Sequence, residues 1–278
     1  MKKIAFITLF PDWIRSSLDH SILARAEASD LVEFSVVNPR SFCYDPHKKV
    51  DDAPYGGHPG MLIKAEPVAL AIESLSSWQL TVGSLQNGVP KTDEPDTSLE
   101  REVSERGTNE PGESIAQNGN ERIPNSKLQT PNSTAIVITE PSGIPFTQTH
   151  AEELANFDQI IFVCGHYEGI DHRIEETFAT HVFSIGDYVL TNGEMPALVM
   201  ADAVVRLIPG VLGNENSLDE ESFQNNLLGA PNYTRPEVWR GIPIPDVLKS
   251  GNHGAIEKWR QQQAEERTRA RRPDLLDS

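Results

Sequence analysis

The chain has 278 residues, of which 38% are apolar, so it can bury a sizeable core, and we expect two modest domains. Its formal net charge of −17 argues against a general nucleic-acid coat, although a local basic region could still meet phosphates. The two cysteines, Cys43 and Cys164, lie far apart without ligand spacing, which predicts a reduced cytoplasmic location without disulfides or structural zinc. No stretch approaches the roughly 18 apolar residues of a membrane span.

The N-terminal part alternates between strand and helix patterns. Apolar runs at residues 4–10 and 32–37 predict strands, while residues 13–27 and 67–77 have helical patterns. The first run is too short for a signal peptide and is broken by Pro11. This alternation predicts an α/β domain with a largely parallel sheet covered by helices.

A change of composition follows. Residues 79–134 are rich in Ser, Asn, Gly, Pro and Glu and contain few large apolar residues. Such a segment cannot bury enough surface to offset its ordering entropy. We therefore expect an acidic, disordered insertion, whose role the sequence does not reveal.

Three further apolar runs each end in a glycine-bearing turn. Residues 134–139 end at "EPSG", residues 159–164 at "GHYEG", and residues 182–185 at Gly186. Ligands of open α/β sheets bind beyond the carboxyl ends of the strands, so the three turns should face one crevice.

The segment "FSIGDYVLTNGEMPAL" (183–198) continues neither as a helix nor as a strand, because it contains Gly186, Gly193 and Pro196. We expect a buried loop whose backbone groups are satisfied by a ligand. A helix should then begin at Pro196 and end before Pro209 and Gly210.

The C-terminal part consists of a polar linker, residues 213–226, and a small unit, residues 227–278, with a helix predicted at about 255–269. Its last turns gather arginines, which can meet phosphates or simply end a solvated helix.

Neither a dinucleotide fingerprint nor a phosphate-binding P-loop is present. The glycine-rich "DDAPYGGHPGM" (51–61) predicts an exposed, adaptable loop. Four residues of "GHYEGIDHRIEE" suggest metal ligands, but Asp171 fits better as a helix N-cap with Glu175 completing a capping-box-like arrangement, so no metal site is expected.

Six segments in this order resemble the bacterial tRNA (guanine-N1)-methyltransferase family, which modifies tRNA position 37: "DDAPYGGHPGM", "VCGHYEGIDHRI", "SIGDYVLTNGEMPA", "RLIPGVLG", "YTRPEVWRG" and "SGNH". The resemblance covers residues 1–78 and 135–272, which is nearly everything outside the acidic insertion.

The resemblance implies a SPOUT-type α/β fold, in which a parallel sheet carries a deep C-terminal trefoil knot, and a homodimer with active sites at the subunit interface. It divides the chain into a knotted domain (1–212), the linker (213–226) and a small, mostly helical, tRNA-binding domain (227–278). The implied activity is transfer of a methyl group from S-adenosylmethionine to N1 of guanosine 37, next to the anticodon. A magnesium requirement is possible.

The resemblance also assigns site residues. Those expected to bind the cofactor are Pro141, Gly165, Glu168, Ile185, Gly186, Tyr188, Leu190, Gly193 and Pro196. Those expected to bind the substrate are Asp51, Tyr55, His58, Asn252 and His253.

Guanine N1 carries a proton, so its attack on a methyl group needs a base, and charge developing on O6 needs a cation. The family's arginine matches Arg206, and Glu221 stands where the family has an aspartate. Asp219 or Glu220 could replace it through a shift of the linker, or the enzyme could be weakened. Two other functions remain open: a related knotted methyltransferase acting on another RNA site, and a non-catalytic RNA-binding paralogue, which the change to Glu221 favours.

Overall fold

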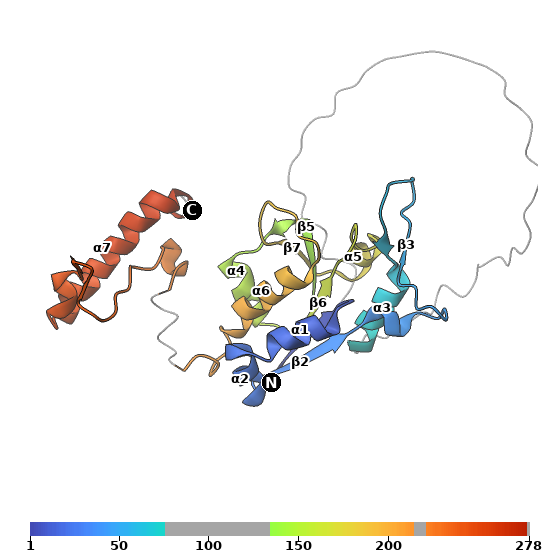
Figure 1. Cartoon of the computed structure of the whole chain (residues 1–278), viewed down its shortest axis with the longest axis horizontal. Helices are drawn as coiled ribbons and strands as arrows, with labels where there is room; N and C mark the ends of the chain where they lie inside the picture. Colours follow the sequence, from blue (N-terminus) through green and yellow to red (C-terminus); the bar gives the residue numbers. More distant parts are fainter. Residues whose placement is uncertain (76–133, 214–220, 277–278) are drawn as a thin grey trace, which may run out of the picture.

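Five parallel strands form the centre of the fold (Figure 1). The computed structural model describes residues 1–75, 134–213 and 221–276. The sheet has the order β2-β1-β6-β5-β7 and consists of β1 (Lys2–Ile7), β2 (Val32–Val37), β5 (Thr134–Pro145), β6 (Gln159–Cys164) and β7 (His181–Ser184). Both faces of its central strands are buried, as their continuous branched apolar runs predict. The predicted α/β class with a parallel sheet is confirmed.

Helices cover both faces of this sheet. One core packs against α1 (Pro11–Leu18), α2 (Ser21–Ala28), α4 (Gln148–Ala155) and α6 (Glu194–Val205). The other packs against α3 (Ala65–Leu75) and α5 (Arg173–Phe178). Alternate residues of each strand enter opposite cores: in β1, Phe6 stacks on Phe162 at 5.4 Å between ring centroids, whereas Ile7 faces the second core.

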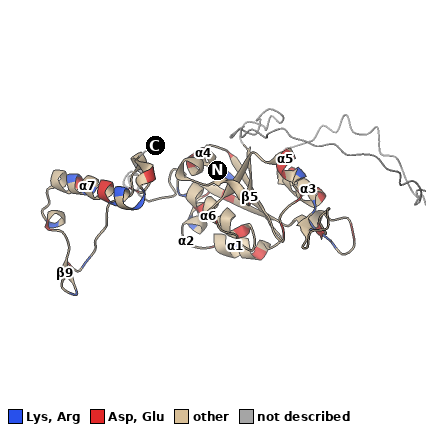
Figure 2. Ribbon diagram, turned by 90° about the horizontal axis from the view of Figure 1, so that it is seen from above, with Lys and Arg blue, Asp and Glu red and all other residues tan. Residues whose placement is uncertain are grey.

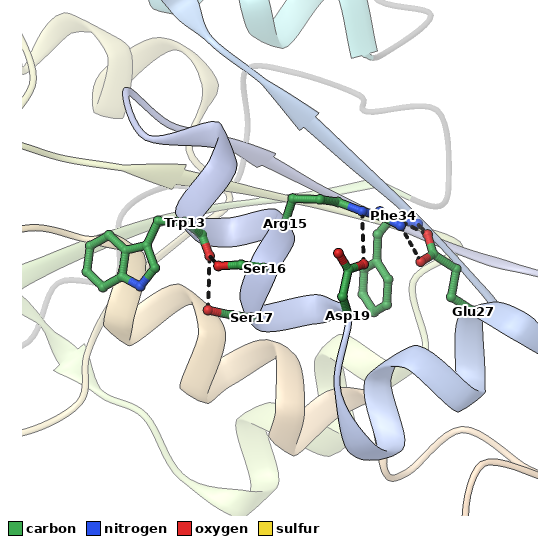
Figure 3. A network of polar contacts seen from close by, with 7 residues as sticks. All are labelled: Trp13, Arg15, Ser16, Ser17, Asp19, Glu27 and Phe34. Carbon is green, nitrogen blue, oxygen red and sulfur yellow. Dashed lines mark hydrogen bonds and ion pairs between the residues drawn. The ribbon is translucent and has the colours of Figure 1, made fainter.

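The single helix predicted over residues 13–27 is in fact two helices. The first ends at Leu18, and Ser21, with φ of +57°, begins the second. Figure 3 shows the polar network that holds this corner: Arg15 forms an ion pair with Asp19 at 3.2 Å and another with Glu27 at 2.7 Å. Neither Gly nor Pro marks this break, so the sequence pattern missed it.

Strand β5 is longer than predicted. It continues through "EPSG" to Pro145, and its register against β7 shifts because Thr139 and Ile144 both pair with Phe183. Residues 140–143 therefore form an outward excursion inside the strand. A Cβ atom on Gly143 would lie 2.7 Å from the backbone of Phe183, so this excursion requires glycine there.

Helix α6 begins two residues earlier than predicted, at Glu194, and ends at Val205, with Arg206 as its C-cap. Pro196 lies in the first turn, where its missing N–H breaks no helical hydrogen bond.

The predicted exposed loop is the tip of a hairpin. Strands β3 (Asp51–Asp52) and β4 (Leu62–Ile63) pair antiparallel, and residues 53–61 connect them. A short helical turn, η1 (Pro39–Phe42), packs nearby against α3.

The C-terminal part lies apart from the sheet in Figure 1. Its elements are η3 (Gln224–Asn226), β8 (Val238–Trp239), β9 (Ile242–Pro243), η4 (Asp246–Lys249), α7 (His253–Arg271) and η5 (Pro273–Leu275). The predicted helix is present and extends two residues further at each end. The predicted insertion, except Thr134, and residues 214–220 of the linker lie outside the described residues. In the described ranges, no helix is long and apolar enough to cross a membrane.

Candidate active site

A cavity of about 200 Å³ lies at the ends of β6 and β7, beside the excursion within β5. Its walls include all nine residues expected to bind the cofactor, namely Pro141, Gly165, Glu168, Ile185, Gly186, Tyr188, Leu190, Gly193 and Pro196. The three glycine-bearing turns therefore face one crevice, as the sequence predicted.

Gly193 holds the turn after β7 against the end of β6 and against Thr139 of β5. Its N–H donates to the carbonyl of Gly165 at 2.8 Å, and its carbonyl accepts from Thr139 Oγ1 at 3.1 Å. A Cβ atom at Gly193 would lie 2.3 Å from Thr139 Oγ1 and 2.7 Å from the Gly165 nitrogen. Only glycine permits this close approach of three backbone segments.

Gly186 is required for a different reason. Its φ of +153° is a conformation that L side chains rarely adopt, and the ring of Tyr188 lies over it, 2.5 Å from where a Cβ atom would stand. The Ser184 hydroxyl accepts from the Gly186 N–H at 3.2 Å and donates to its carbonyl at 3.0 Å. These contacts fix the turn that follows β7.

The expectation of a wholly buried loop is wrong for residues 187–191, which are exposed. Val189 is 81% exposed, and Tyr188 and Leu190 are also exposed. The loop is held at its two ends, by Gly186 and Gly193, and within residues 187–191 the ring of Tyr188 packs back over Gly186 while Val189 stays largely exposed. Its apolar side chains instead form a rim beside the cavity.

The hairpin loop 53–61 is joined to the cavity through Glu168. The Glu168 N–H donates to the Met61 carbonyl at 3.0 Å, and a Cβ atom at Gly60 would lie 2.4 Å from Glu168 Cγ. The substrate candidates on this hairpin, Asp51, Tyr55 and His58, do not line the cavity, and Tyr55 and His58 are exposed.

Asn252 and His253, the other substrate candidates, stand at the start of α7. The Asn252 side chain caps that helix by accepting from the Ala255 N–H at 3.1 Å, and His253 is exposed. They too lie outside the cavity.

A second, smaller hollow beside the cavity contains the carboxyl groups of Glu140 and Glu175. Burial, followed by the neighbouring Glu175 carboxylate, raises the pKa of Glu140. The N-cap of α5 is His172, which forms no side-chain cap hydrogen bond, so the prediction of Asp171 as N-cap is wrong by one residue. Asp171 instead accepts from the Arg173 N–H at 3.1 Å, and Glu175 contacts His172 at 3.5 Å without completing a capping box. Across the described residues, no group of three His, Cys, Asp or Glu side chains is arranged to hold a metal ion.

Arg206 and Glu221 form a bidentate ion pair. Arg206 Nη1 lies 2.5 Å from one Glu221 oxygen, and Nη2 lies 2.6 Å from the other. The hydrogen bonds from Arg206 lower the pKa of Glu221, and the same contact raises the pKa of Arg206. The longer Glu221 side chain therefore reaches the arginine, while the alternatives Asp219 and Glu220 lie outside the described residues.

This ion pair is remote from the cavity of its own chain. Gly193 lines the cavity at the start of α6, and Arg206 follows the last residue of that helix. At a rise of about 1.5 Å per residue, the two are separated by roughly 20 Å. The catalytic candidates and the cofactor candidates therefore do not meet within one chain.

Sequence reasoning missed the buried pair Thr8 and Glu194, and it considered His166 only as a metal ligand. Glu194 is fully buried and accepts from Thr8 Oγ1 at 2.5 Å, while its second oxygen has no partner in the described structure. His166 lines the cavity, and its Nδ1 is likewise buried without a described partner. The position of His166 in the "GHYEG" turn was the sequence feature that could have placed it in the cavity wall. No local pattern could have linked Thr8 with Glu194, because they are 186 residues apart.

Comparison with known proteins gives consistent matches. The family model described as tRNA (Guanine-1)-methyltransferase TrmD matches residues 1–98 and 119–278. A tRNA (guanine-N(1)-)-methyltransferase of Bacillus pumilus is 42% identical over 276 residues, covering 99% of this chain and 92% of the relative. The protein of the same name from Staphylococcus carnosus is 40% identical over 274 residues, covering 99% and 90%. These matches extend over nearly the whole chain, and the chain belongs to the tRNA (guanine-1)-methyltransferase family.

Proposed function

We propose that this chain transfers a methyl group from S-adenosylmethionine to N1 of guanosine 37 in tRNA, next to the anticodon. The observation that carries the proposal is the nearly full-length match to relatives named for this reaction. The bidentate pair of Arg206 and Glu221 supports it, because the two residues assigned to catalysis lie together.

The residues around the cavity fit such a methyl donor. Apolar side chains such as Ile185, Leu190 and Pro196 suit the faces of an adenine, and the glycine turns let backbone donors and acceptors approach its polar edges. The carboxylates of Glu140 and Glu168 at the edge complement a cationic ligand. When bound, the donor supplies a methyl group activated by a positively charged sulfur.

The path of the chain around β6 supports the proposed trefoil knot. Strand β5 pairs with β6 on one side and with β7 on the other, and the segment after β7 then returns to the end of β6. The return is held by the Gly193–Gly165 hydrogen bond and by a bridge between His166 and Asn192. The proposal includes the division into a knotted domain (1–212), a linker (213–226) and a tRNA-binding domain (227–278).

In the proposed mechanism, Glu221 accepts the proton from guanine N1, and Arg206 stabilises the negative charge that develops on O6. The lowered pKa of Glu221 keeps its carboxylate ionised at neutral pH, so it can accept a proton. The same lowered pKa makes Glu221 a weak base as long as both hydrogen bonds from Arg206 persist. When Arg206 turns toward O6, Glu221 loses donors, and its affinity for the proton rises.

The separation of about 20 Å along α6 favours a homodimer, because a second chain could bring its own Arg206 and Glu221 to the cavity. Tyr188 and Val189 on the rim, with Met195 and Val199 on α6, are exposed apolar side chains that a second copy would cover.

The experiment measures methyl incorporation into a tRNA transcript in which guanosine 37 follows another guanosine, with and without magnesium. A transcript with adenosine 37 is the substrate control. Arg206→Ala and Glu221→Ala should each lower the rate on the order of 10²- to 10⁴-fold. Arg173→Ala, which breaks an exposed ion pair elsewhere, should not lower it.

The alternatives give different results. Incorporation into ribosomal RNA alone would support a related methyltransferase with another target. Binding of the donor or of tRNA without turnover by the unaltered chain would support a non-catalytic paralogue.

A further inference from the structure

A small hairpin in the C-terminal part carries an exposed aromatic residue at its tip. Strands β8 and β9 pair Trp239 with Ile242, and Arg240 and Gly241 form the two-residue turn between them. Their φ angles, +50° and +80°, are those of a turn in which both central residues are left-handed. In Figure 2, the hairpin labelled β9 projects away from α7.

The apolar residues of this hairpin are largely uncovered. Trp239 is 58% exposed, Val238 55% and Ile242 64%. An isolated two-stranded hairpin is at best marginally stable in water. Exposed apolar groups so close together are typical of a surface that meets a partner.

Arg240 identifies the chemistry of that partner. Its guanidinium lies 4.9 Å from the centroid of the Trp239 ring. Turns of this type favour Asn or Asp before Gly, and a non-glycine residue with positive φ is uncommon, so turn geometry does not explain an arginine here. The tip therefore presents a flat aromatic surface together with a fixed positive charge.

The charge of the surrounding unit favours an anionic partner. Residues 227–278 contain nine Lys and Arg against seven Asp and Glu, in a chain whose total is −17. Figure 2 shows several basic positions along α7. Close to the hairpin, Arg235 adds a second cation. The nearby acid Asp246 forms an ion pair with Lys249 at 2.7 Å, and Asp246 first and then Glu237 raise the pKa of that lysine.

We propose that Trp239 and Arg240 form a stacking site for an unpaired base of the tRNA, with the base on the Trp239 ring and Arg240 against the base or its phosphate. This proposal rests on the proposed function for its choice of RNA. An aromatic surface with a stacked guanidinium binds any unpaired base, because every base has a π-face, whereas bases within a helix are already stacked. A second copy of this chain is the alternative occupant, and the test below distinguishes it from RNA.

The test compares Trp239→Ala, Trp239→Phe and Arg240→Ala in the full chain, with Tyr44→Ala as a matched control. Tyr44 is an aromatic residue that is 84% exposed on the sheet domain. Affinity for the guanosine-37 transcript is measured by filter binding at several salt concentrations, and KM and kcat by methylation. Because the chain has four tryptophans, the part of the fluorescence quenching that is lost in Trp239→Phe reports stacking on Trp239.

Trp239→Ala should weaken binding and raise KM by about 5- to 100-fold, the range expected for loss of one stacked base, with kcat unchanged. Trp239→Phe should retain most affinity but lose part of the fluorescence quenching. Arg240→Ala should weaken binding and reduce its salt dependence. Tyr44→Ala should behave as the unaltered chain.

Unchanged RNA affinity in Trp239→Ala would overturn the proposal, and if sedimentation then showed loss of a dimer, the hairpin would be an interface between copies. A loss of kcat equal for Trp239→Ala and Trp239→Phe would also overturn it. The unaltered chain could bind tRNA, and the variants could change its affinity as expected, without any methylation of the tRNA. In that case the proposed function would fail and this inference would stand.

Discussion

Replacing Gly193 by alanine tests whether the three strand-end turns are held together by close backbone approach. The φ of Gly193 is −87°, so alanine meets no backbone strain, and its effect arises from the added methyl group alone. That methyl group would lie 2.3 Å from Thr139 Oγ1, 2.7 Å from the Gly165 nitrogen and 3.0 Å from Cys164 Cα. Two of these three atoms belong to backbone at the end of a central strand and cannot move aside easily.

The expected destabilisation follows from these contacts. Overpacking a dense site costs about 1–3 kcal/mol. Separating the turns also weakens the 2.8 Å hydrogen bond between Gly193 and Gly165, worth about 1 kcal/mol. A total of about 2–4 kcal/mol corresponds to a decrease in Tm of about 4–16 °C for a domain of this size.

The assay is thermal unfolding followed by circular dichroism, with two comparison variants. Gly213→Ala places its methyl group in open space and should leave Tm unchanged. Gly165→Ala meets its nearest atom, Ile170 Cγ1, at 3.7 Å, an ordinary van der Waals distance, so the fold should tolerate it and Tm should change little. A Tm for Gly193→Ala within about 2 °C of that of Gly213→Ala would refute the reasoning, since it would fall below the range derived from overpacking.

Two further predictions concern buried polar groups. Burial lowers the pKa of His181, so the unfolded chain binds a proton at this residue more readily than the folded chain. The free energy of unfolding should therefore decrease as the pH falls from the ordinary pKa of 6.5 toward the lower pKa of the folded state. His181→Asn should flatten this part of a plot of Tm against pH. Thr8→Val removes the only described partner of the buried Glu194 carboxylate and should destabilise the fold by about 1–3 kcal/mol in urea unfolding. Thr8→Ser, which keeps the hydroxyl, is its control, and equal midpoints for the two variants would contradict the role of that hydrogen bond.

The strands could be predicted from the sequence because their signal is local. Residues 32–37 and 159–164 are short branched apolar runs flanked by polar residues, and both strands have the predicted bounds. The site was found because three such runs end in glycine, and the carboxyl ends of parallel strands share one edge. Arg206 and Glu221 were chosen as catalytic residues only through the family resemblance, and their ion pair was not predicted.

What could not be predicted depends on partners distant in sequence. The extension of β5 to Pro145 requires pairing with Phe183, some forty residues later. The division between α1 and α2 depends on Arg15 contacting Glu27 across the corner. The exposure of residues 187–191 is decided by what covers them, and a single sequence does not carry that information.

The excursion of residues 140–143 has a consequence for ligand affinity. Since both of its ends remain paired with Phe183, this wall of the cavity has little conformational freedom to lose. A ligand that enters the cavity therefore meets a preorganised wall and does not spend interaction energy on ordering it. Affinity should then depend chiefly on the rim, residues 187–191, the part of the cavity wall that is still free to adjust.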